Sequence, residues 1–339
     1  MHCQWKDKVL AVTSSTFEKL ALDLFRFQYN NNEVYKRYTD ALRVDPDTVR
    51  SIDQIPFLPI RLFKSHRIQT TTFDPATVFE SSGTTGNNNS RHFVKDTGLY
   101  QEAFTKGFEL FYGPVKNWCI LGLLPSYLER ENSSLVYMVN ELARLSSHPV
   151  SGFYLDNYDK LRVLINELED QGQKTILIGV SFALLDFASI YSSWNGRKSL
   201  QHITIMETGG MKGRRKEMVR HELHTVLKRA FNVPGIHSEY GMTELLSQAY
   251  SSGEGIFKCP PWLKVLIRDE DDPFKIRMPF AEPRKSSVSG AVNIIDLANI
   301  YSCSFIATDD AGNLFPTGSF EVLGRLDNSD VRGCSLMVV

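Results

Sequence analysis

A short loop rich in glycine and hydroxyl side chains is the segment best suited to chemistry. It follows a β-prone run and consists of Ser81, Ser82, Gly83, Thr84, Thr85 and Gly86. Its glycines permit backbone angles that expose successive N–H groups, and its hydroxyls supply further donors, so the loop can wrap the oxygens of a polyphosphate. Arg91 or Lys95 could neutralise the phosphate charge. An ordinary polar turn is the alternative, and the missing lysine after Gly86 disfavours a GxxxxGK[ST] nucleotide loop.

Three later segments complete a recognisable series. They are Thr208-Gly209-Gly210 after a predicted strand, Tyr240-Gly241-Met242-Thr243-Glu244, and Gly324-Arg325-Leu326-Asp327. Together with SSGTTG they resemble, in the same order, the signature motifs of the adenylate-forming superfamily. That superfamily includes acyl-CoA synthetases, luciferases and the adenylation domains of peptide synthetases. Four matches in the expected order argue against coincidence.

The resemblance implies a role for each matched residue. SSGTTG and the glycine-rich turn would bind ATP. Tyr240 would stack on adenine, Thr243 would hydrogen-bond the α-phosphate, and Glu244 would hold Mg²⁺ through hard oxygen ligands. Asp309 would accept hydrogen bonds from the ribose hydroxyls. Its triplet, residues 308–310, reads TDD here, whereas most relatives have TGD. Arg325 would contact ribose or phosphate. Each residue also has a purely structural alternative. Tyr240 could be a packed aromatic ring, Glu244 a carboxylate at the start of a helix, and Arg325 a solvated surface charge.

The end of the sequence points to one branch of the superfamily. Typical members continue for about a hundred residues beyond the GRxD hinge, in a small lid with a catalytic lysine. This sequence stops at Val339, so we expect the lid to be missing. The ending GRLDNSDVRGCSLMVV resembles the LuxE-type acyl-protein synthetases of the bacterial luminescence fatty-acid reductase complex, as do IPFLPIRLFKSHRI and LPSYLERENSSLVYMVNEL.

In that family a cysteine near the carboxyl terminus accepts the acyl group, and Cys334 is the matching residue. A thiolate is a strong nucleophile for an acyl-adenylate, and Arg332 could lower the thiol pKa from its reference near ~8.5. A small buried side chain on a final strand is the alternative.

The resemblance therefore implies a cytoplasmic ligase that uses ATP and Mg²⁺. A carboxylic acid, expected to be a fatty acid, would become an acyl-AMP, and Cys334 would then capture the acyl group as a thioester. The expected recipient is an acyl-CoA or acyl-protein reductase partner. Strand-end residues Pro125, Ser126 and Tyr127 suggest a substrate pocket. An acyl- or aryl-CoA ligase of the phenylacetate type and a nucleotide-binding protein that has lost adenylation remain alternatives.

Composition agrees with this interpretation. The 339 residues, 42% of them hydrophobic, can bury a large core. No apolar stretch approaches the ~20 residues needed to span a bilayer, and the amino terminus lacks the apolar core of a signal peptide. A net charge of −1 without a long basic run argues against nucleic-acid binding. Five scattered cysteines without a CxxC pair predict reduced thiols and neither a disulfide framework nor a zinc site.

The elements that must position these residues alternate along the chain. Strands at 118–124, 175–180 and 203–206 are separated by helices at 135–145, 161–168 and 183–191, which predicts a mostly parallel sheet flanked by helices. An amphipathic segment at 214–231 precedes strands at 263–268, 291–296, 304–307 and 319–323. The expected fold class is α/β, the large amino-terminal domain of adenylate-forming enzymes with a β-rich subdomain. We divide it into a helical and extended part (1–75), a nucleotide-binding α/β part (76–240) and a β-rich part (241–339).

Local signals add smaller predictions. Ser15 and Glu18 predict a capping box for a first helix, and Pro56 and Pro59 make 55–68 an extended arm. In GVSFA the second glycine of a nucleophile elbow is missing, so Ser181 is interpreted as a helix N-cap. His221 and His224 form HELH, one residue short of the HExxH zinc spacing, and are predicted to be surface residues.

Overall fold

The structure is a computed structural model that describes residues 2–81, 89–124, 132–155, 157–195, 198–209, 218–277, 279 and 287–326. The helices are α1 (His2–Leu10), α2 (Ser14–Asn31), α3 (Glu33–Ala41), α4 (Leu62–Ser65), α5 (Thr97–Tyr112), α6 (Ser134–Ser146), α7 (Tyr158–Asp170), α8 (Ser181–Ser193) and α9 (Arg220–Phe231). The strands of the first half are β1 (Leu58–Pro59), β2 (Thr77–Glu80), β3 (Arg91–Val94), β4 (Cys119–Leu123), β5 (Gly152–Phe153), β6 (Thr175–Gly179) and β7 (Ile203–Glu207). The later strands are β8 (His237–Tyr240), β9 (Ala249–Ser251), β10 (Ile256–Phe257), β11 (Leu263–Arg268), β12 (Ile276–Arg277), β13 (Val288–Asp296), β14 (Phe305–Leu314) and β15 (Phe320–Arg325).

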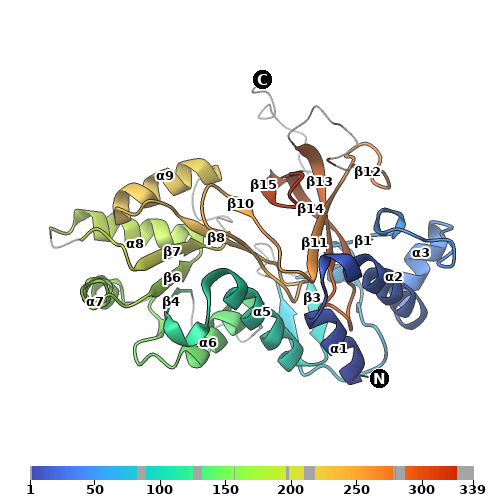
Figure 1. The fold of residues 1–339 in the computed structure, drawn as a ribbon, viewed down its shortest axis with the longest axis horizontal. Helices are drawn as coiled ribbons and strands as arrows, with labels where there is room; N and C mark the ends of the chain where they lie inside the picture. Colours follow the sequence, from blue (N-terminus) through green and yellow to red (C-terminus); the bar gives the residue numbers. More distant parts are fainter. Residues whose placement is uncertain are drawn as a thin grey trace.

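A mostly parallel sheet with the order β5-β4-β6-β7-β8-β9 occupies one half of the molecule (Figure 1). Its central strands β4, β6 and β7 are mostly apolar, as expected for strands covered by helices on both faces. Along β4, Leu121 packs toward α7, α8 and α9, whereas Ile120 packs toward α5 and α6. The predicted alternation of strands and helices is confirmed.

A second, mostly antiparallel sheet has the order β10-β15-β14-β13-β11-β12. The predicted β-rich carboxyl-terminal part is therefore confirmed. The proline-containing arm adds β1 to this sheet, pairing in parallel with β14 at Leu58 and Ile306. Proline lacks a backbone N–H, which suits such a short edge strand.

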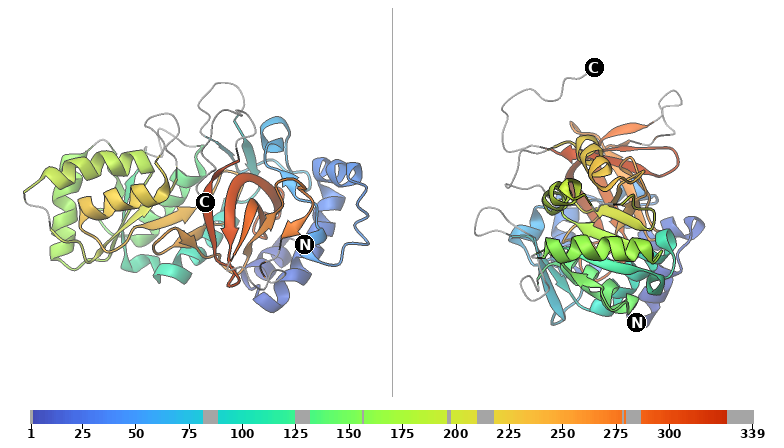
Figure 2. Two further views of the ribbon diagram at one scale, coloured as in Figure 1. Left: turned by 90° about the horizontal axis from the view of Figure 1, so that it is seen from above. Right: turned by 90° about the vertical axis from the view of Figure 1, so that its left-hand side faces the viewer.

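The amino-terminal helices lie beside this second sheet, at the end of the molecule away from α7 (Figure 2). Phe305 of β14 makes the contact, with its ring centroid 6.2 Å from that of Phe25 and 6.1 Å from that of Tyr35. Segments from the two ends of the chain thus share one core.

None of the described helices is long and apolar enough to cross a bilayer.

Three local predictions need correction. Helix α2 begins at Ser14, and its N-cap is Thr13, whose backbone N–H donates to Thr16 Oγ1 at 3.0 Å. The Ser15–Glu18 capping box was therefore wrong, and Glu18 instead accepts from the Ile52 backbone at 3.3 Å. Both pairs have capping-type spacing, so spacing alone could not choose between them.

The second and third corrections concern α8 and α9. Val180 is the N-cap of α8, so Ser181 is the first helical residue instead of the cap. His221 is exposed as predicted, but His224 is buried, with Nε2 3.5 Å from Glu207 Oε1. The buried face of α9 includes Leu223 beside His224, and the polar HELH pattern concealed that His224 shares this face.

Candidate active site

Two of the predicted motifs meet at the carboxyl-terminal edge of the parallel sheet. Strands β7 and β8 are neighbours, with Glu207 opposite Ser238, so the residues that follow them emerge side by side. Thr208 Oγ1 donates a 2.6 Å hydrogen bond to Glu239 Oε2, on the residue just before Tyr240, and so ties the turn after β7 to the end of β8. In α/β proteins this edge is the usual place for a ligand.

Glycine is required at two positions of these motifs. Gly209 has φ of +46°, a left-handed conformation that other residues rarely adopt. At Gly241 a Cβ atom would lie 2.4 Å from Glu239 Oε1, so a side chain would displace that carboxyl group. Gly209 and Gly241 thus leave the backbone of both turns without a side chain at these positions, close to the edge of the sheet. Gly210 lies outside the described residues.

Tyr240 connects the parallel sheet to the second sheet. Its hydroxyl donates a 2.7 Å hydrogen bond to Asp310 Oδ2. Its ring centroid lies 5.8 Å from that of Phe257 and 5.5 Å from that of Phe320. Arg325 is the cross-strand partner of Asp310, with Nε 3.8 Å from Asp310 Oδ1. Tyr240, Asp310 and Arg325 therefore form one cluster between the two sheets.

The predicted ribose ligand, Asp309, lies apart from this cluster. Its carboxylate accepts from Arg61 Nε at 3.0 Å, on the arm that follows β1. Neighbouring residues of a strand point to opposite faces, so Asp309 and Asp310 cannot both face Tyr240. Asp310 was not among the predicted site residues. Matching the TDD triplet to TGD position by position would have selected it, because the acid of that pattern is the third residue.

Thr243 and Glu244 lie in the connection between β8 and β9, which forms neither helix nor strand. Thr243 is half-buried and Glu244 is buried. Hydrogen bonds from side chains of other elements hold their backbone carbonyls: His92 Nδ1 donates to Thr243 at 2.8 Å, and Asn299 Nδ2 donates to Glu244 at 2.7 Å. Neither His92 nor Asn299 was among the predicted site residues.

Ser81 is the described end of the predicted phosphate loop. Its backbone N–H donates to the Ser90 carbonyl at 3.0 Å, and the Ser90 N–H donates to Ser81 Oγ at 2.9 Å. This pair joins the end of β2 to the residue just before β3, and the rest of the loop lies between these two residues in the sequence. The remaining predicted site residues lie outside the described part of the chain: Ser82, Gly83, Thr84, Thr85, Gly86, Gly210 and Cys334, together with Asp327 and the pocket residues Pro125, Ser126 and Tyr127.

Two buried glutamates flank the Thr208 turn and differ in charge. Burial raises the pKa of Glu239 to about 7, the bond from Thr208 opposes this, and neighbouring Glu207 adds to it. Burial also pushes the pKa of Glu207 upward. There, however, hydrogen bonds and the charge of Arg220 outweigh burial, and the pKa falls to about 2. Arg220 Nε donates to Glu207 Oε1 at 3.0 Å. The turn is thus held between an ionised carboxylate and a carboxyl group that titrates near neutrality.

Solved structures of known proteins share this fold. ATP-bound MatB from Rhodopseudomonas palustris superposes with a TM-score of 0.53 and 14% identity, covering 74% of this chain and 48% of MatB. A luciferase-like enzyme from the nonluminescent mealworm Zophobas morio gives a TM-score of 0.51 and 14% identity, covering 85% of this chain and 62% of that enzyme. The chain thus spans about half the length of MatB. The predicted fold class, that of the adenylate-forming enzymes, is confirmed.

Sequence comparisons identify the family. A long-chain-fatty-acid–luciferin-component ligase from Aliivibrio fischeri is 23% identical over 343 residues, which cover 94% of this chain and 86% of that ligase. A ligase of the same name from Photorhabdus luminescens is 40% identical over 70 residues, 20% of this chain and 60% of the ligase. The family model described as acyl-protein synthetase, LuxE, matches residues 11–339. The chain therefore belongs to the LuxE family of acyl-protein synthetases, which are enzymes.

Proposed function

We propose that this chain activates a fatty acid with ATP as an acyl-adenylate and then holds the acyl group as a thioester on Cys334. The observation that carries the first half is the convergence of Thr208, Tyr240 and Asp310 through the hydrogen bonds Thr208–Glu239 and Tyr240–Asp310. Segments separated in sequence are thereby brought together where the two sheets meet. The family match and the names of both relatives, which are long-chain-fatty-acid ligases, support the fatty acid as substrate.

In the first step, a carboxylate oxygen of the acid attacks the α-phosphorus of ATP. A new P–O bond forms, the bond between the α-phosphorus and the bridging oxygen breaks, and pyrophosphate leaves. Tyr240 offers an aromatic face for adenine, and Asp310 offers a carboxylate for the ribose hydroxyls. We assign the ribose contact to Asp310 in place of Asp309, because Asp310 lies beside Tyr240 and Arg325. SSGTTG is assigned to the β- and γ-phosphates.

Magnesium fits the chemistry of the Thr243–Glu244 pair. A carboxylate is the hard oxygen ligand that Mg²⁺ prefers, and the ion usually completes its shell with substrate phosphates and water. Among the described residues, no group of three or more His, Cys, Asp or Glu side chains could hold a metal by itself. We therefore assign Glu244 as the single protein carboxylate, with the ion reducing the charge of the phosphates when it is bound.

In the second step, the thiolate of Cys334 attacks the acyl carbonyl, a C–S bond forms, and AMP leaves with the electrons of the broken C–O bond. The described thiols are poorly suited to this step, because burial raises the pKa of Cys119 to about 11 and of Cys259 and Cys303 to about 12. Few of these thiols would be ionised at neutral pH. We assign the onward acceptor of the acyl group to a reductase partner.

The test follows radiolabelled long-chain fatty acid and ATP–pyrophosphate exchange in the wild type, Cys334→Ser and the control Cys259→Ser. We expect acid-dependent exchange in all three proteins, with covalent label absent from Cys334→Ser alone. Label that survives Cys334→Ser would remove this residue from the mechanism. Label found only on added coenzyme A would identify a CoA ligase, and nucleotide binding without exchange would identify a protein that has lost adenylation.

A further inference from the structure

The connection between β8 and β9 carries Thr243 and Glu244 but has no secondary structure of its own to hold it. Buried backbone carbonyls need hydrogen-bond donors, and here two consecutive carbonyls receive them from side chains of distant segments. His92 Nδ1 on β3 donates to the Thr243 carbonyl at 2.8 Å. Asn299 Nδ2, in the turn between β13 and β14, donates to the Glu244 carbonyl at 2.7 Å.

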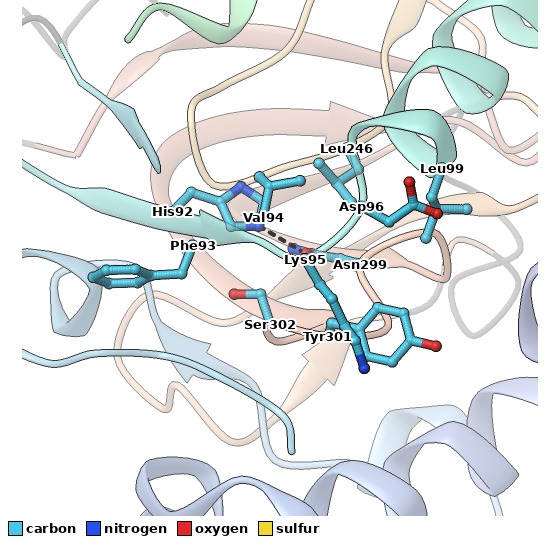
Figure 3. A pocket seen from close by; sticks show the side chains of 10 residues that line it. All are labelled: His92, Phe93, Val94, Lys95, Asp96, Leu99, Leu246, Asn299, Tyr301 and Ser302. Carbon is cyan, nitrogen blue, oxygen red and sulfur yellow. Dashed lines mark hydrogen bonds between the residues drawn. The ribbon is translucent and has the colours of Figure 1, made fainter. Parts of the chain in front are cut away.

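The two side chains also lie against each other. His92 Nε2 lies 3.0 Å from Asn299 Oδ1, the pair joined by a dashed line in Figure 3. Burial lowers the pKa of His92 to about 4, so the neutral ring that donates from Nδ1 carries no proton on Nε2. Asn299 Nδ2 donates a second bond to the Cys303 carbonyl at 2.9 Å, which sets the orientation of the amide. The exposed fraction is 1% for His92 and 0% for Asn299. Water therefore does not compete for these bonds, and neither side chain has room to turn.

The same turn holds the segment that follows Glu244. Asp296 Oδ2 accepts from the Leu246 backbone at 2.8 Å, and Asp296 Oδ1 accepts from Ser247 Oγ at 2.6 Å. The turn itself is anchored on α2, because Gln28 Nε2 donates to the Asn299 carbonyl at 2.9 Å. Rigid elements on several sides thus determine where the connection lies.

The space around this pair is too small for a ligand. The cavity lined by His92, Lys95, Asn299 and Tyr301 (Figure 3) has a volume of about 10 Å³. That volume is at the lower limit for a single water molecule. The polar groups of His92 and Asn299 therefore bind protein atoms and not a ligand. Any effect that they have on the reaction must pass through Thr243 and Glu244.

We propose that His92 and Asn299 are positioning residues that place Thr243 and Glu244 against the α-phosphate and its metal ion. The inference rests on the proposed adenylation. Reacting groups must be held within a fraction of an ångström, and a displacement of about 1 Å can reduce the rate about 10²-fold. His92 and Asn299 bind backbone carbonyls of the protein, so we expect the adenine and ribose contacts to stay intact when they are changed.

The test compares two isosteric substitutions. Asn299→Asp removes donors to the Glu244 and Cys303 carbonyls. The control Asn32→Asp removes donors to the Ser302 carbonyl and Thr70 Oγ1, at 3.1 and 3.2 Å, from a residue that is 1% exposed. Ser302 belongs to the same turn as Asn299, but neither of these bonds reaches Thr243 or Glu244. For Asn299→Asp we expect kcat of ATP–pyrophosphate exchange to fall about 10²-fold with KM for ATP little changed. The control should lose stability without this fall in kcat.

A second pair tests His92 by rescue. Asparagine places an amide nitrogen where histidine has Nδ1, so His92→Asn keeps a donor for the Thr243 carbonyl and should recover most of the activity that His92→Leu loses. Hydrogen–deuterium exchange supplies a readout independent of catalysis. The amides of 243–247 should exchange faster in Asn299→Asp and His92→Leu, but not in Asn32→Asp.

Unchanged protection of 243–247 in Asn299→Asp would overturn the positioning role, as would equal losses of kcat in the two asparagine variants. A wild type without acid-dependent exchange would instead overturn the proposed function, and with it any catalytic meaning of the positioning. Because amide exchange does not depend on turnover, the two failures are distinguishable.

Discussion

Replacing Glu239 with glutamine should stabilise the protein above neutral pH. Glu239 is 7% exposed, and burial raises its pKa from 4.5 to about 7. A carboxyl group whose pKa is raised on folding contributes stability fully below its unfolded pKa, and the contribution is lost as pH rises through the folded value. Its window is therefore about pH 4.5 to 7. The pKa difference of roughly 2.5 corresponds to about 3 kcal/mol of the free energy of unfolding.

The assay is urea unfolding followed by tryptophan fluorescence at intervals between pH 5 and pH 9. Glutamine does not titrate, yet its amide oxygen can still accept from Thr208 Oγ1, so the turn is preserved. The free energy of unfolding of Glu239→Gln, minus that of the wild type, should increase by about 2.5 kcal/mol across this range, because pH 5 already lies inside the window. Buried Asp296 and His92 also titrate, but they are common to both proteins and cancel in the difference.

Glu207→Gln is the matched control with the opposite sign. Hydrogen bonds and Arg220 outweigh burial and lower the pKa of Glu207 to about 2, so its ionised form stabilises the fold above the unfolded pKa. This variant should be less stable than the wild type at neutral pH, and the deficit should shrink as pH falls below about 4.5. A pH-independent difference for Glu239→Gln, or the same sign for both variants, would refute the assignment of opposite charge states.

Two further substitutions, each paired with a control, test the site and the turn. Asp310→Asn should weaken binding of a non-hydrolysable ATP analogue by at least about tenfold in calorimetric titration, because hydrogen bonds to a charged group contribute about 1.5–3 kcal/mol. Asp309→Asn, which loses only the partly exposed pair with Arg61, should change binding by less than about 1 kcal/mol, and equal weakening would contradict the ribose assignment. Gly209→Ala should lose about 1–2 kcal/mol in thermal unfolding because of its left-handed φ. Gly235→Ala should be neutral or stabilising, because Gly235 is not among the positive-φ glycines of the described chain; equal losses at both glycines would exclude backbone strain as the cause.

The strands of the parallel sheet were predictable because each is buried on both faces. Such strands are mostly apolar along their whole length, and β4, β6 and β7 lie where the predicted apolar segments occur. The four motifs were recognisable for a related reason, since their glycines and hydroxyls serve local backbone needs that the neighbouring sequence already shows. The left-handed φ of Gly209 is one such need.

Which face a polar residue occupies was much harder to predict. Asp309 and Asp310 are chemically identical neighbours, and only the pairing of β14 with β15 places Asp310 opposite Arg325 and within reach of Tyr240. The predictions for His224 and for the N-cap of α2 were wrong for the same reason. In the local sequence, His221 and His224, and likewise Thr13 and Ser15, have equal propensity for the two environments. In each case the choice belongs to a packing partner far away in the sequence.

By itself, the sequence determined the kinds of element, their order and the chemical types of the site residues, since these follow from periodicity and from side-chain chemistry. The tertiary structure decided which residues meet. His92 and Asn299 are 207 positions apart, yet both donate hydrogen bonds to the connection that carries Thr243 and Glu244. No local pattern marks such a pair, because a hydrogen bond between distant segments is set by the path of the whole chain.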